Sequence, residues 1–405
     1  MCFRIITDNK IKVSTLKLSI IFWLVAFQNI WERFVFAAKA IDELFAIVLV
    51  SVCVALKRKQ DKFSISILLG LSLYAIAGFC GNLIYSYQSW GYVLIDFVTN
   101  IKFWLTLVAV YLLLKNRDLM SIKEDLYKLS IIASWCLFIV TAIERINGVI
   151  NNGVDYLWTQ VIEPFGHSTY LVAAEVFLVS LILLKQKNDR SYLTLFVNCL
   201  LIVMTYRSKG YGIVIVIFAI LLIEKKPELK KIIVGLACGA VVLAASYKLR
   251  FYYIELRGKA ARSVLSQTAL QIMNDYFPIG TGFGTYSSHV TIKTYSPVYY
   301  IYGFENTIEL NPDTSRALFD DVFWPIIIGQ TGILGIISYL SMIGNSFAKI
   351  IRRKGNAFYL PSIICLLYLL ISSTSETAFN NPMSIPFAAV IGMGLAYTEK
   401  RLENK

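Results

Sequence analysis

The sequence carries little charge for its length. Asp, Glu, Lys and Arg make up only 16% of the 405 residues, and 57% of the residues are hydrophobic. An average soluble chain has roughly 25% charged residues. The hydrophobic residues fall into long blocks separated by short charged segments, which is the pattern of a helical protein that crosses a membrane several times. We therefore predict an all-α polytopic membrane protein embedded in a lipid bilayer.

Residues that bind metals or form disulfides are also scarce. The sequence has two histidines, His167 and His289, and no CxxC or HExxH pattern. Of the seven cysteines, Cys2 is terminal and the others lie inside apolar blocks. We therefore predict no disulfide framework, no protein-built transition-metal site and no cofactor.

The positive charge is spread over many short segments. The net charge is +13, but Lys and Arg form no single patch that could hold a nucleic acid, so we predict no nucleic-acid partner. In a membrane protein such an excess is typical of cytoplasmic loops. We also expect no cleavable signal peptide, because the only nearby A-x-A-like site, residues 38–40, lies well past the first apolar block.

The hydrophobic blocks predict about twelve transmembrane segments. Their approximate spans are 16–31, 37–56, 63–85, 92–114, 129–143, 168–184, 192–205, 211–223, 232–247, 322–345, 358–372 and 385–397. With alternating loops, one side receives the basic ones, which are 57–62, 115–128, 185–190, 224–231, 349–356 and the C-terminal tail. The other side receives segments poor in basic residues, which are 86–91, 144–167 and 373–382. This asymmetry places both termini in the cytoplasm.

One short turn breaks the charge rule. "YRSKG", residues 206–210, falls on the outer side but contains Arg207 and Lys209. Arg207 could simply reach the outer headgroups. Alternatively, the two cations hold an anion at the outer membrane face. The sequence leaves both interpretations open.

The longest loop, about 248–321, lies outside between the ninth and tenth segments. It divides the chain into residues 1–247, 248–321 and 322–405, and we expect it to be folded because it is rich in aromatic residues. Its first part predicts an amphipathic helix with Arg257 and Arg262 in its first turns. The predicted apolar face comprises Ala261, Leu265, Ala269, Ile272 and Tyr276, and the polar face comprises Ser263, Gln267, Gln271 and Asn274.

Several polar or glycine-rich positions admit two interpretations. The glycines of 277–286 favour tight turns and close helix packing over a dinucleotide site, because no strand is predicted before them. Asp320 and Asp321 either cap the following helix or supply a carboxylate base or sugar ligand. Tyrosines of the loop either stack on sugars or anchor it at the interface; they are Tyr295, Tyr299, Tyr300 and Tyr302. Polar groups inside the fourth segment are either buried partners or part of a cavity; they are Asp96, Asn100 and Lys102.

Three stretches carry a resemblance to a known family. They are "TYRSKGYGIVIV", "ARSVLSQTALQIMNDYFPIGTGFGTY" and "DDVFWPIIIGQTGILGII". Their order, spacing and predicted outer location resemble the O-antigen polymerase and O-antigen ligase superfamily of bacterial polysaccharide assembly. The motifs cover roughly residues 200–340, and the order and topology of the segments are similar over most of the chain.

The resemblance implies an integral, metal-independent glycosyltransferase of the bacterial inner membrane that uses an undecaprenyl-diphosphate-linked oligosaccharide. Arg207 and Arg262 match the family's arginines and would contact the lipid diphosphate. We add Lys209 and Arg257 as further diphosphate-binding residues. A chain-length regulator and a flippase would be its protein partners.

The expected reaction extends a glycan by one lipid-linked repeat unit. Without a metal, fixed guanidinium groups would stabilise the departing diphosphate, and Asp320 or Asp321 would accept the proton of the attacking hydroxyl. Ligases of the superfamily usually carry His then Asn where this chain has Asp320-Asp321, which favours a repeat-unit polymerase. The alternatives are a ligase that transfers the glycan to lipid A–core, and a flippase or other transporter. A transporter would more often show related halves, and we find no internal repeat.

Overall fold

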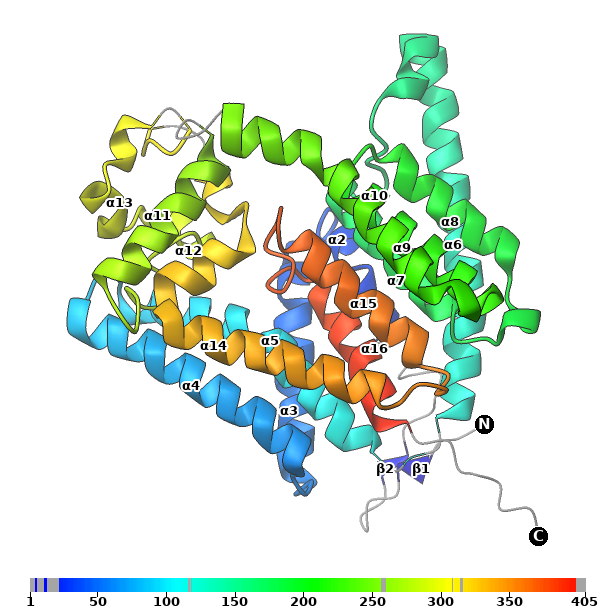
Figure 1. Cartoon of the computed structure of the whole chain (residues 1–405), viewed down its shortest axis with the longest axis horizontal. Helices are drawn as coiled ribbons and strands as arrows, with labels where there is room; N and C mark the ends of the chain where they lie inside the picture. Colours follow the sequence, from blue (N-terminus) through cyan, green and yellow to red (C-terminus); the bar gives the residue numbers. More distant parts are fainter. Residues whose placement is uncertain are drawn as a thin grey trace.

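In the computed structural model the chain is built almost entirely of helices (Figure 1). The structure describes residues 4–5, 11–12, 22–115, 117, 119–255, 260–307, 309–313 and 316–397. The α-helices are α2 (Gln28–Trp31), α3 (Ile41–Ala55), α4 (Lys62–Tyr85), α5 (Trp90–Leu114), α6 (Met120–Asn152), α7 (Ser168–Ile182), α8 (Tyr192–Met204), α9 (Ser208–Lys225), α10 (Lys230–Arg250), α11 (Ala261–Asp275), α12 (His289–Thr294), α13 (Pro297–Ile301), α14 (Phe323–Ile351), α15 (Tyr359–Ser372) and α16 (Ser384–Ala396). The predicted all-helical character is confirmed.

Short elements connect these helices. The 3-10 helices are η1 (Phe36–Ala40), η2 (Val154–Trp158), η3 (Lys187–Asp189), η4 (Pro227–Leu229), η6 (Phe304–Asn306) and η7 (Arg316–Asp320), and η5 (Phe251–Glu255) is a π-helical turn. Near the N-terminus, β1 (Arg4–Ile5) and β2 (Ile11–Lys12) pair antiparallel.

Among the described residues, four helices are long and apolar enough to cross a membrane, namely α4, α5, α6 and α14. The apolar helices α7, α8, α15 and α16 have only 13–15 residues. They therefore extend about 20 Å, whereas a bilayer's hydrocarbon core is about 30 Å thick. These apolar helices indicate a membrane protein. That the chain crosses the membrane twelve times remains a prediction. Residues 16–21 of the first predicted segment lie outside the described residues.

The helices form two groups, and α15 and α16 lie between these groups (Figure 1). Helix α4 packs along α14, and α5 packs along α3 and α16. Helices α6 to α10 lie on the other side, and α15 links the groups by packing on α16, α7 and α9. The short helices α11 to α13 gather at one end of α14.

Contacts between loops divide the bundle into two ends. At the end that we call the basic end, Lys185 pairs with Glu124 at 2.8 Å and Arg190 pairs with Glu224 at 2.6 Å. At the opposite end, which we call the long-loop end, Gln88 donates to the carbonyl of Gly284 at 2.9 Å. In each of these three contacts, both loops are ones that the sequence pattern assigns to the same side.

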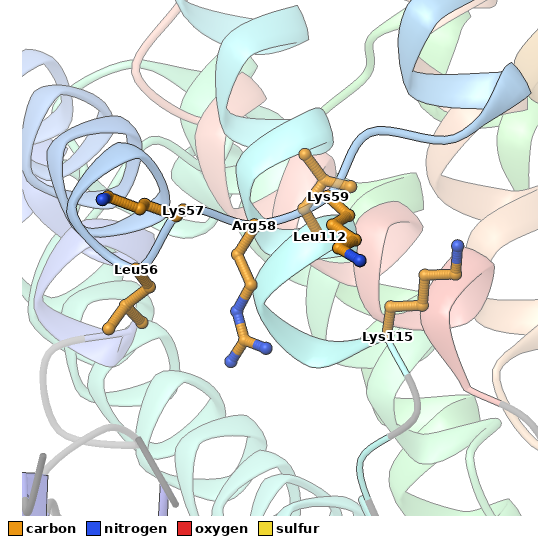
Figure 2. Close-up of a pocket in the computed structure, with 6 residues that line it drawn as sticks. All are labelled: Leu56, Lys57, Arg58, Lys59, Leu112 and Lys115. Atoms are coloured by element: carbon orange, nitrogen blue, oxygen red, sulfur yellow. The ribbon is translucent and has the colours of Figure 1, made fainter. Parts of the chain in front are cut away.

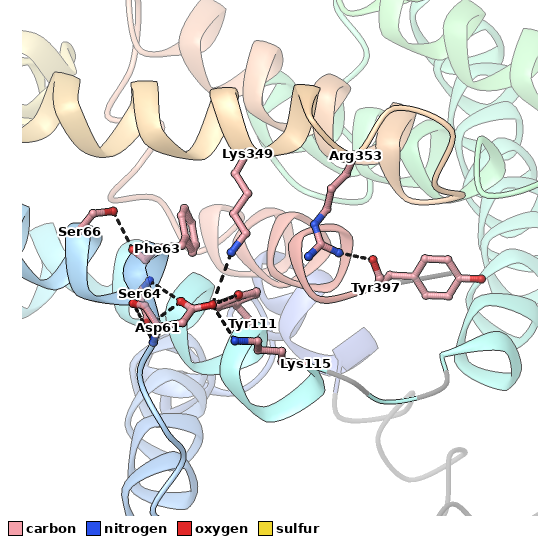
Figure 3. Close-up of polar contacts among 9 residues, drawn as sticks. All are labelled: Asp61, Phe63, Ser64, Ser66, Tyr111, Lys115, Lys349, Arg353 and Tyr397. Atoms are coloured by element: carbon pink, nitrogen blue, oxygen red, sulfur yellow. Dashed lines mark hydrogen bonds and ion pairs between the residues drawn. The ribbon is translucent and has the colours of Figure 1, made fainter. Parts of the chain in front are cut away.

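A pocket opens at the basic end where α3 and α5 finish. It is lined by Leu56, Lys57, Arg58, Lys59, Leu112 and Lys115 (Figure 2). Beside it, Asp61 ties three helices together (Figure 3). Asp61 caps α4 through the backbone N–H of Ser64, and it accepts hydrogen bonds from Tyr111 and from Lys115 of the α5 end, the latter at 2.7 Å. Lys349 of α14 lies 3.9 Å from the same carboxylate.

The polar residues predicted inside the fourth segment are buried partners. Lys102 forms ion pairs with Asp42 and, at 2.8 Å, with Glu43. Asp96 accepts hydrogen bonds from the backbone N–H of Gly284 at 2.9 Å and from Asn100 at 3.0 Å. Lys102 and Asp96 therefore join α5 to other elements, as expected where ionisable groups are placed among apolar helices.

The long segment between α10 and α14 is folded, as predicted. It has its own apolar core, formed by Leu265, Ala269, Ile272, Tyr286, Val298, Tyr299, Phe304 and Phe319 among others. The predicted apolar face of α11 is confirmed, because Ala261, Leu265, Ala269 and Ile272 are buried. Ser263 was predicted on the polar face and is buried instead, where its hydroxyl donates to the carbonyl of Ala260 at 2.9 Å.

Candidate functional site

Four helices begin at one place on the long-loop end. His167 is the N-cap of α7 and Arg207 is the N-cap of α9. Arg262 is the second residue of α11, and Asp321 lies two residues before α14. Because helix N-termini present unpaired N–H groups and a positive dipole end, such an arrangement favours an anion.

These helix ends carry a set of charged side chains that we call the cationic cluster. It consists of Arg207, Lys209, Arg262, His167, Asp321 and Glu376. Lys209 interacts electrostatically with Arg207, Arg262 and Glu376, and His167 with Arg207, Lys209 and Asp321. Three residues that the sequence predicts to bind an anion are therefore brought together, although they come from segments more than 50 positions apart.

Arg262 is held by two partners within the cluster. Its Nε donates to Asp321 Oδ2 at 2.5 Å and its Nη2 donates to Asp321 Oδ1 at 3.0 Å. The Nη2 atom also donates to the carbonyl of Ser375 at 3.2 Å. This two-point contact fixes the guanidinium plane, which a Lys side chain could not achieve.

Lys209 is buried and pairs with a carboxylate. Its ammonium group forms an ion pair with Glu376, in the connection between α15 and α16. A buried ammonium group requires such a partner, because desolvation of an isolated charge is costly. Glu376 thus belongs to the cluster, although nothing in its local sequence indicates this role.

Arg207 differs from the other two cations because it has no carboxylate partner among the described residues. Its Nε donates to the hydroxyl of buried Ser168 at 2.6 Å, and its Nη2 lies 3.4 Å from His167 Nε2. Three cations against two carboxylates leave the cluster with one positive charge. That charge resides on Arg207, which is partly exposed.

His167 faces hydrogen-bond donors from two sides. Its Nδ1 accepts from the backbone N–H of Thr169 at 3.2 Å, and its Nε2 faces Arg207. Partial burial, together with the charges of Arg207 and Lys209, lowers the pKa of His167. A neutral imidazole carries one ring proton, so with Nδ1 accepting, the Nε2 proton points at a guanidinium. An acceptor placed between Arg207 and His167 would satisfy both donors.

Asp320 and Asp321 do not cap the following helix. The N-cap of α14 is Val322, and no side chain of a described residue caps this terminus. The capping interpretation is therefore wrong, because the helix begins at Phe323, one residue later than a cap at Asp321 would require. Asp320 is partly exposed, and its Oδ2 lies 3.2 Å from Nδ1 of the exposed His289.

The remaining predicted site residues lie outside the cationic cluster or outside the described residues. Arg257 lies outside the described residues. Tyr295 and Tyr299 are buried in the core of the long segment, so neither sugar stacking nor interfacial anchoring applies to them. Tyr300 is exposed, and Tyr302 donates a hydrogen bond to Asp275 at 2.7 Å. Among the residues that the structure describes, no three His, Cys, Asp or Glu side chains are grouped so that they could hold a metal ion.

The glycine-rich segment 277–286 packs closely against α14 of the same chain, as the packing interpretation predicts. The N–H groups of Thr281 and Gly282 donate to the carbonyls of Gly329 and Gln330 in α14, at 3.0 and 2.8 Å. A Cβ atom on Gly280, which has a φ of +71°, would lie 2.6 Å from the carbonyl oxygen of Gly329. These backbone donors are occupied, so they are not available to cradle a phosphate.

Comparison with known proteins does not extend this description. No protein-family model matches the chain, and no curated protein matches it significantly.

Proposed function

We propose that this chain is a membrane glycosyltransferase that polymerises oligosaccharide repeat units carried on undecaprenyl diphosphate. The observation that supports the proposal most directly is the cationic cluster, where four helix N-termini and an uncompensated arginine meet at one end of a membrane protein. A diphosphate is the anionic group that such a donor set suits. The sequence resemblance described above supports the choice of a lipid-linked glycan as substrate.

The reaction needs one bond to break and one to form. The hydroxyl oxygen of one lipid-linked repeat unit attacks the anomeric carbon of the glycan on another lipid. The bond between that carbon and the diphosphate oxygen breaks, and undecaprenyl diphosphate leaves with the electron pair. The hydroxyl proton passes to a base, and the negative charge that develops on the diphosphate is stabilised by fixed cations.

The geometry suggests a role for each residue. Arg207 contacts the diphosphate directly because no described carboxylate pairs with it, and Lys209 and Arg262 contribute their charge nearby. Asp321 orients Arg262 through both of its oxygens. Asp320 is the better candidate for the base because its only described partner is an exposed imidazole. Preorganised donors of this kind are worth about 3 kcal/mol each in a transition state.

The proposal also includes the topology. The basic loops would be cytoplasmic, with both termini, in the bacterial inner membrane, and the cationic cluster would face outward. This is supported by the loop contacts, because described ion pairs between loops join only loops of the same predicted side. A chain-length regulator and a flippase would act beside it.

Reconstitution tests the proposed activity. Purified protein in proteoliposomes with lipid-linked repeat units should produce a ladder of longer lipid-linked glycans. The Arg207→Ala variant should produce none while reaching the membrane in the same amount. Joining that requires lipid A–core would show a ligase instead, and movement of repeat units across the bilayer without joining would show a transporter.

A further inference from the structure

The pocket at the basic end has an unusual charge composition. Its volume is about 270 Å³. Four of its six lining residues are cationic and none is acidic. In Figure 2 the side chain of Arg58 lies between Lys57 on one side and Lys59 and Lys115 on the other. Since a water molecule occupies about 30 Å³ in the liquid, this space has room for a phosphodiester group.

Neighbouring carboxylates compensate only part of this charge. Asp61 pairs with Lys115 at 2.7 Å and lies 3.9 Å from Lys349. Within the described part of the chain, no carboxylate forms an ion pair with Lys57, Arg58 or Lys59. Three of the four cations that line the pocket, Lys57, Arg58 and Lys59, therefore have no carboxylate partner among the described residues.

Arg58 adds a second and independent observation. Its Nε atom is buried, and no hydrogen-bond partner for it exists among the described residues. A buried polar atom without a partner is rare in a folded protein. The Nε–H and a terminal N–H of a guanidinium form the fork that grips two phosphate oxygens. The guanidinium of Arg58 therefore lines the pocket with an N–H group that no described residue satisfies.

The surroundings of the pocket identify the kind of phosphate. The helix that leads into it, α3, exposes an apolar surface, with Leu44 58% and Val54 71% exposed. In a membrane protein such a surface contacts lipid tails. Lys57 then takes a left-handed conformation, with a φ of 45°, at a position that glycine usually occupies after a helix. A ligand here would meet cations at its head and apolar side chains along its tail.

We propose that this pocket binds the phosphate group of an anionic phospholipid from the adjacent leaflet, with Arg58 as the main contact. Lys57, Lys59 and Lys115 surround the same phosphate, and the acyl chains lie along α3. This lipid site is at the opposite end of the bundle from the cationic cluster and does not depend on the proposed glycosyltransferase activity.

Lipid retention tests the site directly. The full chain would be equilibrated in nanodiscs of equimolar phosphatidylglycerol and phosphatidylcholine, released in a mass spectrometer, and its bound lipids counted. We expect the wild type to retain phosphatidylglycerol preferentially. Arg58→Gln should lower that preference about tenfold, the effect of losing a hydrogen-bonded charge. Lys59→Gln alters only an exposed side chain, so it should fold normally, and it should lower the preference in the same direction.

A matched control separates a site from general attraction. Arg352→Gln removes the same charge from an exposed residue at the basic end, outside the pocket, and should leave the preference unchanged. Equal losses in the Arg58 and Arg352 variants would mean diffuse attraction to an anionic surface and would overturn the proposal. Displacement of the lipid by millimolar inorganic phosphate would also overturn it, because the ligand would then be the free anion.

Discussion

Arg262 and Asp321 form a two-point ion pair, with Nε to Oδ2 at 2.5 Å and Nη2 to Oδ1 at 3.0 Å. The pair joins the first turn of α11 to the residues that precede α14. Because both carboxylate oxygens are engaged, Asp321 is suited to orienting a guanidinium and poorly suited to accepting a proton. The adjacent Asp320 is left as the better base.

This difference predicts unequal effects of two similar substitutions. Asp320→Asn should lower kcat by about 100-fold or more, the usual contribution of a general base, with little change in KM. Asp321→Asn should have a smaller effect on kcat and should alter KM for the lipid-linked donor, because Arg262 loses its orientation. Both are measured as initial rates of glycan joining in proteoliposomes. A larger kcat loss for Asp321→Asn would reverse the two roles.

A second prediction concerns pH and His167. The pKa of His167 is lowered by partial burial and by Arg207 and Lys209, whereas an unfolded histidine titrates near about 6.5. Below that pH the unfolded chain binds a proton that the folded chain resists, so folded-state stability should fall as the pH drops through about 6.5.

Thermal unfolding between pH 8 and pH 5 measures this effect. The unfolding midpoint of the wild type should fall across the window, and the fall should be smaller in His167→Asn. His289→Asn serves as the control, because His289 lies outside the cationic cluster. The account of His167 fails if its substitution leaves the pH dependence as it was.

A third prediction concerns the network around Asp61 at the basic end. Burial alone would raise the pKa of Asp61, but hydrogen bonds from Lys115, the Ser64 N–H and Tyr111 outweigh it and hold the pKa below its ordinary value. The ionised carboxylate therefore stabilises the fold. Asp61→Asn should lower the free energy of unfolding by about 2 kcal/mol at neutral pH.

The stabilisation that Asp61 provides should decrease at low pH. Because the folded pKa is depressed, the stabilisation is fully present above the unfolded value of about 3.9 and is lost as the pH falls further. The difference in unfolding midpoint between wild type and Asp61→Asn should be constant from pH 8 to pH 6 and shrink below about pH 4. Asp155→Asn, at an exposed position, should show no difference. An Asp61→Asn variant as stable as the wild type would contradict the role of the network.

The sequence predicts the helices well and the site only in part. Hydrophobic blocks locate the helices because burial and lipid contact require apolar length. Arg207 and Lys209 stand out because they break the charge pattern, and Arg262 stands out through the resemblance of its stretch to a known family. His167 and Glu376 do not, since their roles depend on the packing of distant loops. The only local signal for His167 is its position directly before an apolar run, where a helix N-cap is expected.

The sequence pattern does not predict which polar and aromatic residues of the long segment are buried. Ser263 is buried in the first turn of α11, a helix that packs on α14, and its hydroxyl is satisfied by the carbonyl of Ala260. Tyr295 and Tyr299 are buried because both pack against Phe319, which is distant in sequence, Tyr295 edge-to-face and Tyr299 stacked. A one-sequence pattern has no access to such partners.

The central claim is that the cationic cluster binds a lipid diphosphate through Arg207. The most direct measurement is the dissociation constant of a short-chain prenyl diphosphate for the purified protein, compared between the wild type, Arg207→Gln and Arg352→Gln. We predict that Arg207→Gln weakens binding by about tenfold or more, because a charged hydrogen-bonding fork is lost, while Arg352→Gln binds as the wild type does. Equal affinity for the wild type and the Arg207 variant would contradict the account.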